Sequence, residues 1–339
     1  AITFLDRHIK VLFVVSRMIH LTVPLCLEYL RTHKDLEAKV FLADIFQNLF
    51  PIAQAIDPEL IPLSKVNVES DVYQKLYSFV EDKVCKGVIV DGKEYLDTVT
   101  IDQETLKNEM RNNKTIKTST PPLGQVIEYF ENLFALGYDH IIHFTISSKL
   151  SSMFNLFTGV ALNHFPGKLT IIDSYSLSTG MINNVLYAKE EVEKGTSIDE
   201  IVAQIEKRKH EGTIFFIPEN LTALKNGGRI SPAIAAIGNT IGLKPVISLV
   251  EGELVKTAMT TVVKKAFFDR LNKIISEYPT TEFDYSLVGF DAKEAIFDAI
   301  YDNLTKLLNG VEAIKGVIPI NVCAHCGPGS IGVCISPKI

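Results

Sequence analysis

Short apolar runs alternate with amphipathic stretches along the middle of the chain. The runs at 140–146, 169–172 and 213–217 have the length of buried strands. Between them, residues 123–135 and 153–161 carry apolar side chains at the three- and four-residue spacing of one helical face. Strands that alternate with helices favour a parallel sheet with helices on its faces. The alternation therefore predicts an α/β fold.

The flanking regions add strands of a different kind. Ser197 followed by Glu200 is typical of a capping box at a helix N-terminus. Two later runs flank Glu251 and Gly252 as in a hairpin, so the second sheet is expected to be mixed. The strands expected outside the central region are 10–15, 246–250, 254–259, 284–289, 316–322 and 331–335.

A polar run at 207–212 separates two strongly patterned regions. We place a domain boundary there. The prediction is an N-terminal parallel-sheet domain over 1–210 and a C-terminal mixed-sheet α/β domain over 211–339.

Composition excludes several classes of protein. A net charge of −6 disfavours general binding to nucleic acid or to an anionic membrane, because the long-range field repels phosphate. No apolar run approaches the 18 residues of a membrane-spanning helix, so no integral membrane association is expected. Five cysteines in 339 residues do not suggest a disulfide framework, and the first ten residues lack a signal-peptide pattern. We expect a cytoplasmic protein.

The segment Ser147-Ser148-Lys149-Leu150-Ser151-Ser152 lies between an expected strand and an expected helix. The first amides of a helix have no partner within it and attract anions. The hydroxyls of Ser147, Ser148 and Ser151 would add donors to such a site. The plainer alternative is helix capping, which serine performs at many helix starts.

A second group of hydroxyls, Thr118, Ser119 and Thr120, precedes two prolines and an expected helix. The prolines restrict the loop, so these hydroxyls could converge on a ligand. The alternative is again a cap, with proline in the first turn of the helix.

Arg229 follows the pair Gly227-Gly228. Glycines allow a close approach of the backbone, and arginine offers a forked donor for a carboxylate or phosphate. The alternative is a helix C-terminus beside a surface arginine. No GxxxxGK[ST] phosphate loop occurs in the sequence.

The segment 323–332 contains His325 among Cys323, Cys326 and three glycines. Its GxGxxG spacing is rejected as a dinucleotide fingerprint, because too little chain follows for the required helix. One CxxC pair is too few ligands for a structural zinc site, so no metal is expected. We place His325 between a strand and a glycine turn, where its imidazole can donate to an anion. His140 and His143, three apart on a strand, point to opposite faces and do not form a metal pair.

These clusters, in this order, resemble the motifs of the DegV family. The resemblance covers residues 91–335. Its six motifs are Asp91-Gly92-Lys93-Glu94-Tyr95, Thr118-Ser119-Thr120-Pro121, Ser147 to Met153, Ile172-Asp173-Ser174, Gly227-Gly228-Arg229-Ile230 and Ala324 to Gly332.

The family resemblance implies the two-domain EDD fold and a long-chain fatty acid bound between the domains. It implies that the carboxylate meets Thr118 and Ser151, and that Arg229 and His325 serve phosphoryl transfer. Ser119, Ser147 and Ser148 complete the expected lipid-binding set. The implied ligand is an acid such as palmitate, stearate or oleate, with no further cofactor. Its partner would be the ATP-binding subunit of a bacterial fatty-acid kinase, whose acyl phosphate enters phospholipid synthesis.

The sequence departs from the family pattern in places. The first strand leads to Val15-Ser16-Arg17 in place of an Asp-Ser-Thr loop, and Pro62-Leu63-Ser64 lies far ahead of Asp91. We therefore expect an insertion within 34–87. Ser152 and Met153 replace a glycine and a threonine at the helix start, which would narrow the head-group site.

Two other functions remain open from the residues. One is an independent phosphotransferase that uses the same anion site on a small molecule. The other is a structural or interaction protein whose hydroxyl loops only cap helices. A co-purifying acyl chain would favour the carrier, and ATP turnover by the isolated protein would favour the phosphotransferase.

Overall fold

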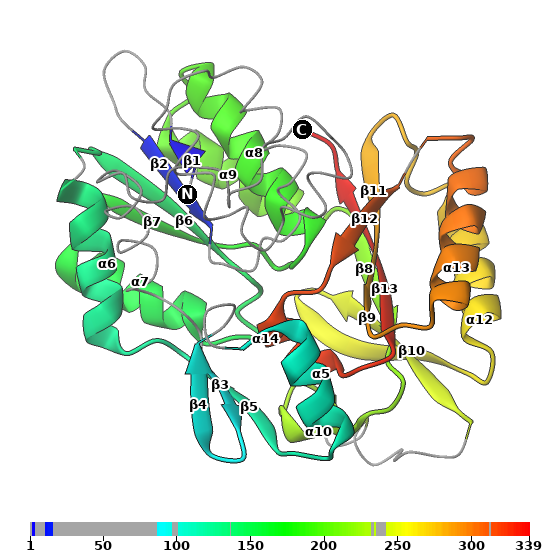
Figure 1. The fold of residues 1–339 in the computed structure, drawn as a ribbon. Coiled ribbons are helices and arrows are strands. Elements are labelled where there is room, and N and C mark those ends of the chain that lie inside the picture. Colours follow the sequence, from blue (N-terminus) through cyan, green and yellow to red (C-terminus); the bar gives the residue numbers. More distant parts are fainter. Residues whose placement is uncertain are drawn as a thin grey trace, which may run out of the picture.

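The computed structural model describes residues 2–3, 11–15, 87–96, 101–135, 137–231, 234, 242–311 and 313–339. The described residues form two lobes, one around a four-stranded sheet and one around a six-stranded sheet (Figure 1). The expected insertion within 34–87 and the segment Pro62-Leu63-Ser64 fall almost entirely outside the described residues.

The four-stranded sheet has the order β1-β2-β6-β7. Its strands β2 (Val11–Val15), β6 (His140–Thr145) and β7 (Leu169–Asp173) run parallel, and β1 (Ile2–Thr3) is antiparallel to β2. These bounds agree closely with the expected strands. The parallel sheet predicted from the alternation is confirmed.

Helices cover both faces of this sheet. Successive residues of β6 point to opposite sides, so Ile141 packs against α6 and α7, whereas Ile142 packs against α8 and α9. The four helices are α6 (Leu123–Ala135), α7 (Met153–His164), α8 (Thr179–Glu193) and α9 (Ile198–Arg208). The capping box is present at the start of α9, where the Ser197 hydroxyl accepts from the Glu200 backbone N–H.

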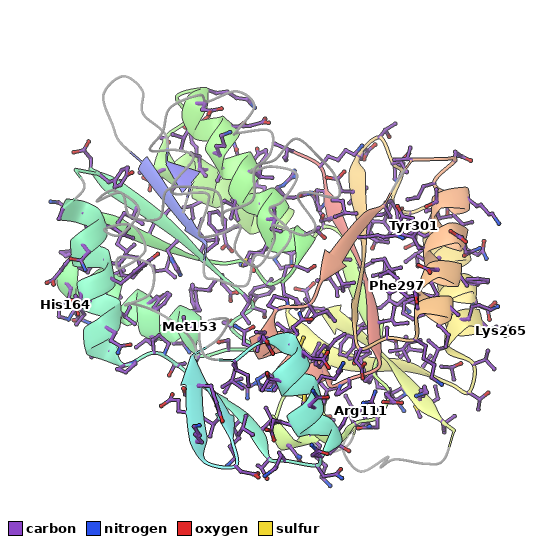
Figure 2. The ribbon with its side chains drawn as sticks, in the orientation of Figure 1. Arg111, Met153, His164, Lys265, Phe297 and Tyr301 are labelled. Carbon is purple, nitrogen blue, oxygen red and sulfur yellow. The ribbon has the colours of Figure 1, made fainter. Side chains whose placement is uncertain are left out.

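The six-stranded sheet is mixed, as expected. Only β11 and β12 are parallel in it, and every other neighbouring pair is antiparallel. Helices α12 (Val263–Ile274) and α13 (Glu294–Leu307) cover its outer face. Phe297 and Tyr301 of α13 pack against the hydrophobic core between these helices and the sheet (Figure 2). The strand order is β10 (Glu253–Thr260), β9 (Lys244–Val250), β8 (Thr213–Ile217), β13 (Ser330–Pro337), β11 (Phe283–Phe290) and β12 (Ile314–Val317).

A third, small sheet packs on the second lobe. It has the order β4-β3-β5, with β3 (Gly87–Val90), β4 (Lys93–Leu96) and β5 (Ile116–Ser119). With helix α5 (Gln103–Arg111), it shares a core with Ile320 and Cys323 of the C-terminal half. Residues 87–119 therefore lie against the second lobe although they precede most of the first. The boundary at 210 stays a prediction.

One strand assignment was wrong. The run at 316–322 was expected to be a strand, but β12 ends at Val317 and α14 (Ile320–Cys326) follows. Pro319, at the N-cap of α14, has no N–H to continue a ladder and suits a helix start. His325 consequently lies in the last turn of a short helix and not directly after a strand. A second short helix among the described residues, α10 (Thr222–Asn226), has Gly227 as its C-cap.

Candidate functional site

An apolar cavity of about 120 Å³ lies between the lobes. The first lobe contributes Ile146 from the end of β6 and Leu177 from the loop before α8. The second contributes Phe216 of β8, Leu254 of β10 and Val333 of β13. A cavity with apolar walls and a few polar groups is the usual form of a small-molecule site.

One end of the cavity is polar. Thr118 of β5 and His325 of α14 both line it, and the Thr118 Oγ1 lies 2.9 Å from the His325 Nε2. Which of the two donates depends on the imidazole tautomer. Thr118 arrives there because β5 pairs with β3, and that small sheet packs directly against α14.

Arg229 lines the same cavity and completes the polar group. Its Nε donates to the Leu150 carbonyl at 3.2 Å, and its Nη1 donates to the Gly227 carbonyl. Burial lowers the pKa of the Arg229 guanidinium from its usual value, but arginine retains its charge at neutral pH. A cation, an imidazole and a hydroxyl therefore line one cavity.

Gly227 makes this arrangement possible. A Cβ on Gly227 would lie 2.2 Å from the His325 Nδ1, so the imidazole rests directly on the backbone of that residue. The close approach needs the absence of a side chain and no unusual backbone angle, since Gly227 has φ −74°. The Gly-Gly-Arg and Ala-His motifs are in this way parts of one site.

The cavity extends along β13 to a second end. Ser330 donates to the Cys326 carbonyl beside α14, whereas Cys334 lies next to Gly180 at the start of α8. Four residues of strand separate these ends by roughly 13 Å. Burial raises the pKa of the Cys334 thiol to about 11, so it stays protonated at neutral pH. Ser178, two residues before Gly180, also lines the cavity.

The four serines predicted to bind lipid are not among the residues that line this cavity. The Ser119 hydroxyl donates to Glu94 at 2.7 Å. The Ser147 hydroxyl is fully buried and donates to the Gly252 carbonyl at 2.6 Å, which ties the first lobe to the β9–β10 turn.

Ser148 and Ser151 organise the loop itself. The Ser148 N–H and the Tyr175 N–H both donate to one carboxylate oxygen of buried Asp173. The Ser151 Oγ accepts from the Met153 N–H at 3.3 Å, at the start of α7. The Ile-Asp-Ser motif therefore supplies the Asp173 carboxylate that holds the serine loop in place. A role of the serines in ligand binding stays a prediction.

Sequence reasoning missed three polar residues of the cavity, namely Ser178, Asn321 and Ser330. Asn321 was hidden in a run interpreted as a strand, and its helical spacing to His325 is the signal that could have found it. Ser178 stands at the N-cap of α8 in no recognisable motif, and its φ of 60° is evident only in the structure.

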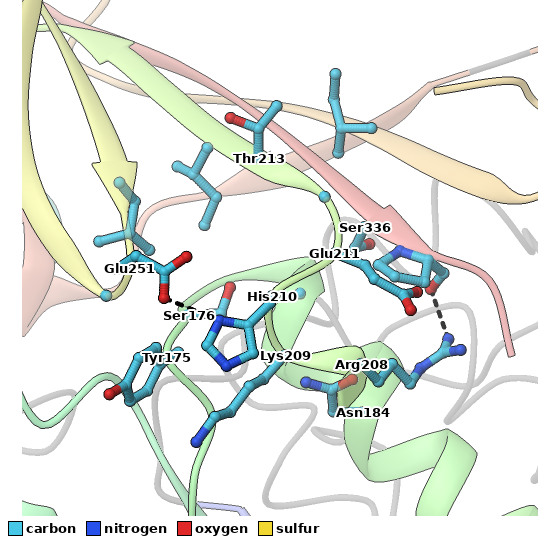
Figure 3. Close-up of a pocket in the computed structure, with 17 residues that line it drawn as sticks. Tyr175, Ser176, Asn184, Arg208, Lys209, His210, Glu211, Thr213, Glu251 and Ser336 are labelled. Carbon is cyan, nitrogen blue, oxygen red and sulfur yellow. Dashed lines mark hydrogen bonds and ion pairs between the residues drawn. The ribbon is translucent and has the colours of Figure 1, made fainter. Parts of the chain in front are cut away.

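A second, polar cleft of about 60 Å³ lies where the chain crosses between the lobes (Figure 3). It contains none of the predicted site residues. The His210 Nδ1 lies 2.9 Å from a Glu251 carboxylate oxygen, and Arg208 donates to the Pro337 carbonyl. These contacts give Arg208, His210 and Glu251 structural partners.

The part of the chain that the structure describes holds neither a cluster of metal ligands nor a membrane-spanning helix. No group of three or more His, Cys, Asp or Glu side chains there could hold a metal ion. None of the helices there is both long and apolar enough to cross a membrane.

The lobes, the cavity and its polar end define a class of two-lobed α/β proteins that enclose a mainly apolar cavity. Residues 84–338 match the family described as "Uncharacterised protein, DegV family". A DegV domain-containing protein of Clostridium acetobutylicum is 30% identical over 285 residues, which cover 82% of this chain and 98% of that protein. This chain belongs to the DegV family.

Solved structures of the family are similar in fold. The fatty-acid-binding DegV family protein of Streptococcus agalactiae has a TM-score of 0.68 at 25% identity, over 76% of this chain and 91% of its own. The Thermus thermophilus DegV family protein, also described by its fatty-acid binding, has a TM-score of 0.66 at 25% identity, over 75% and 91%. The two-domain fold expected from the sequence motifs is confirmed at the level of the family.

Proposed function

We propose that this protein binds a long-chain fatty acid in the cavity between its lobes and presents the carboxylate to a separate ATP-dependent kinase subunit. The observation that carries the proposal is the apolar cavity that Thr118, Arg229 and His325 line together. The two solved relatives, each described as binding fatty acid, support the same class of ligand. Palmitate, stearate and oleate are the proposed acids.

The two ends of such a ligand contribute differently to binding. Each buried methylene contributes about 0.8 kcal/mol, so a chain of about 15 contributes about 12 kcal/mol before the costs of association. A hydrogen bond from a neutral hydroxyl adds about 1 kcal/mol. The alkyl tail accordingly decides affinity, and the polar end decides where the carboxylate lies.

Phosphoryl transfer to that carboxylate calls for positive charge and hydrogen-bond donors beside the reacting oxygens. Arg229 supplies a fixed charge, and His325 supplies a ring nitrogen held by Thr118. We propose these two residues as the ones that favour the transferring phosphoryl group, with ATP brought by the kinase subunit. The three cysteines that the structure describes form no disulfide bond, which suits the reducing cytoplasm where we place this activity.

Native mass spectrometry of the purified protein tests the binding. We expect a bound mass equal to a C16 or C18 acid, and an acyl phosphate once ATP and the kinase subunit are added. Leu177→Phe adds bulk within the cavity and should lower the retained acid. Leu162→Phe, the same change at a side chain that is 70% exposed on α7, is the matched control.

The outcomes separate the remaining functions. ATP turnover by the isolated protein with no bound lipid would favour the small-molecule phosphotransferase. Absence of both lipid and turnover would overturn the carrier and the phosphotransferase together and would favour a structural or interaction protein.

A further inference from the structure

The mainly apolar cavity contains a side-chain amide whose oxygen has no partner among the described residues. Asn321 lines the cavity from α14 and is only 5% exposed. Its Oδ1 is buried and has no hydrogen-bond partner among the described residues. An unpaired polar atom in such a place lowers stability by about 1–3 kcal/mol. An alkyl chain that passed Asn321 would leave this deficit in place.

The position of Asn321 along the cavity follows from the helix that carries it. Asn321 and His325 are four residues apart in α14, so both side chains lie on one face, with their Cβ atoms roughly 6 Å apart. A carboxylate held at His325 therefore brings the first few carbons of its chain past Asn321.

The chemistry of the amide selects the group it would bind. Its oxygen accepts one hydrogen bond or more, and its NH₂ group donates two. A hydroxyl can both donate and accept, so it pairs with either end of the amide. A further carboxylate would meet no second cation, because Arg229 is the only lysine or arginine among the described residues that line the cavity.

We propose that the cavity takes a fatty acid with a hydroxyl near its carboxylate, a 3-hydroxy acid, and that Asn321 binds this hydroxyl. The inference rests on the proposed function, because the carboxylate must first lie at His325. Asn321 is then a specificity-determining residue that separates 3-hydroxy acids from unsubstituted acids of the same length.

Ser178 provides a comparison at the other end of the cavity. Its Oγ is also buried without a partner among the described residues, and it stands at the N-cap of α8 without capping it. Ser178 directly precedes Thr179, whose hydroxyl lies 3.0 Å from that of Ser286, the residue paired with Cys334 in the sheet. Cys334 lies roughly 13 Å along β13 from Ser330. Ser178 therefore lies toward the end of the cavity away from the head group.

The experiment compares dissociation constants for hexadecanoic acid, each enantiomer of 3-hydroxyhexadecanoic acid, octadecanoic acid and 12-hydroxyoctadecanoic acid. We expect the delipidated full chain to bind one 3-hydroxy enantiomer about two- to tenfold more tightly than hexadecanoic acid. Asn321→Leu keeps the side-chain size, so it should reverse this preference and tighten hexadecanoic acid binding. Ser178→Ala removes a hydroxyl from the far end and should leave the preference intact.

Each contrary outcome has a distinct meaning. Equal affinity of the wild-type chain for plain and 3-hydroxy acids overturns the inference. A water that bridges Asn321 to the protein would produce this result. Binding of hexadecanoic acid would still uphold the proposed function. A preference for the 3-hydroxy acid that survives Asn321→Leu also overturns the inference. So does a preference for the 12-hydroxy acid that Ser178→Ala abolishes. Absence of binding for every acid overturns the proposed function itself. The wild-type ratio decides the matter even if a variant does not fold.

Discussion

The Thr118 hydroxyl and the His325 imidazole lie 2.9 Å apart although 207 residues separate them in the chain. The contact joins β5 of the small sheet to the last turn of α14. It fixes the imidazole at the polar end of a cavity whose other walls are mainly apolar. The hydrogen bond therefore links the packing of the small sheet to the geometry of the proposed head-group site.

Thr118→Val removes this hydrogen bond while it keeps the shape of the side chain. Loss of one neutral hydrogen bond should weaken fatty-acid binding about two- to tenfold and slow acyl-phosphate formation. Titration with a fluorescent fatty acid and a kinase assay would measure the two effects. Thr118→Ser retains the hydroxyl and should behave like the wild type. Unchanged binding and phosphorylation in Thr118→Val would show that Thr118 does not hold the head group.

Gly227→Ala should displace His325, because the new Cβ would lie 2.2 Å from the ring Nδ1. We expect a loss of about 1–3 kcal/mol in the free energy of unfolding and at least tenfold slower acyl-phosphate formation. Gly228→Ala is the matched control. Its Cβ would meet nothing within 4 Å, although its φ of +67° costs about 1–2 kcal/mol.

The two alanine variants should thus lose similar stability and differ in activity. The imidazole resonances of His325 in NMR spectra would show the displacement directly. Equal phosphorylation rates in both variants would mean that the ring position is unimportant.

Ser151→Ala tests whether that serine acts on the ligand or on the helix. Its hydroxyl accepts from the Met153 N–H, so its loss should lower the free energy of unfolding by about 1 kcal/mol. We expect little change in fatty-acid affinity, because Ser151 is not among the residues that line the cavity. Chemical denaturation and ligand titration measure the two quantities. A drop in affinity without a drop in stability would restore the head-group role predicted from the sequence.

His143 should make the protein sensitive to acid. The ring is 2% exposed and packs edge-on against Phe157 and Phe130, and this burial lowers its pKa from 6.5 to about 3. The unfolded chain binds a proton below pH 6.5 that the folded chain does not bind until about pH 3. Stability from this source is therefore complete above pH 6.5 and falls as the pH drops toward 3, by about 4–5 kcal/mol in all.

His143→Leu replaces the imidazole with an apolar side chain of similar size. Its free energy of unfolding should decline less between pH 6.5 and 4 than that of the wild type, as urea denaturation across this range would show. His164, in the last turn of α7, offers a control at a surface position. A parallel decline in wild type and His143→Leu would assign the acid sensitivity to other groups.

Much of the first lobe could be predicted because its signals are local. Helix α6 (Leu123–Ala135) has the predicted bounds, since its apolar spacing and the following Gly137 lie within one stretch of chain. The capping box at Ser197 is equally local, because both partners lie within one turn. Helix α14 escaped prediction because seven residues are too few to display a period, and Pro319 was the only local indication of its start.

In the candidate site, too, local features could be predicted from the sequence and long-range contacts could not. The sequence alone identified the chemistry of Thr118, Arg229 and His325, because hydroxyl, guanidinium and imidazole groups are properties of single residues. Tertiary structure decided which of the predicted site residues line one cavity. It paired the Ser147 hydroxyl with Gly252 of the neighbouring lobe and the Ser148 N–H with Asp173 of the same lobe. It also brought Asn321 into the cavity. Contacts between segments about 200 residues apart depend on how the sheets pack, and no local pattern of side chains encodes that packing.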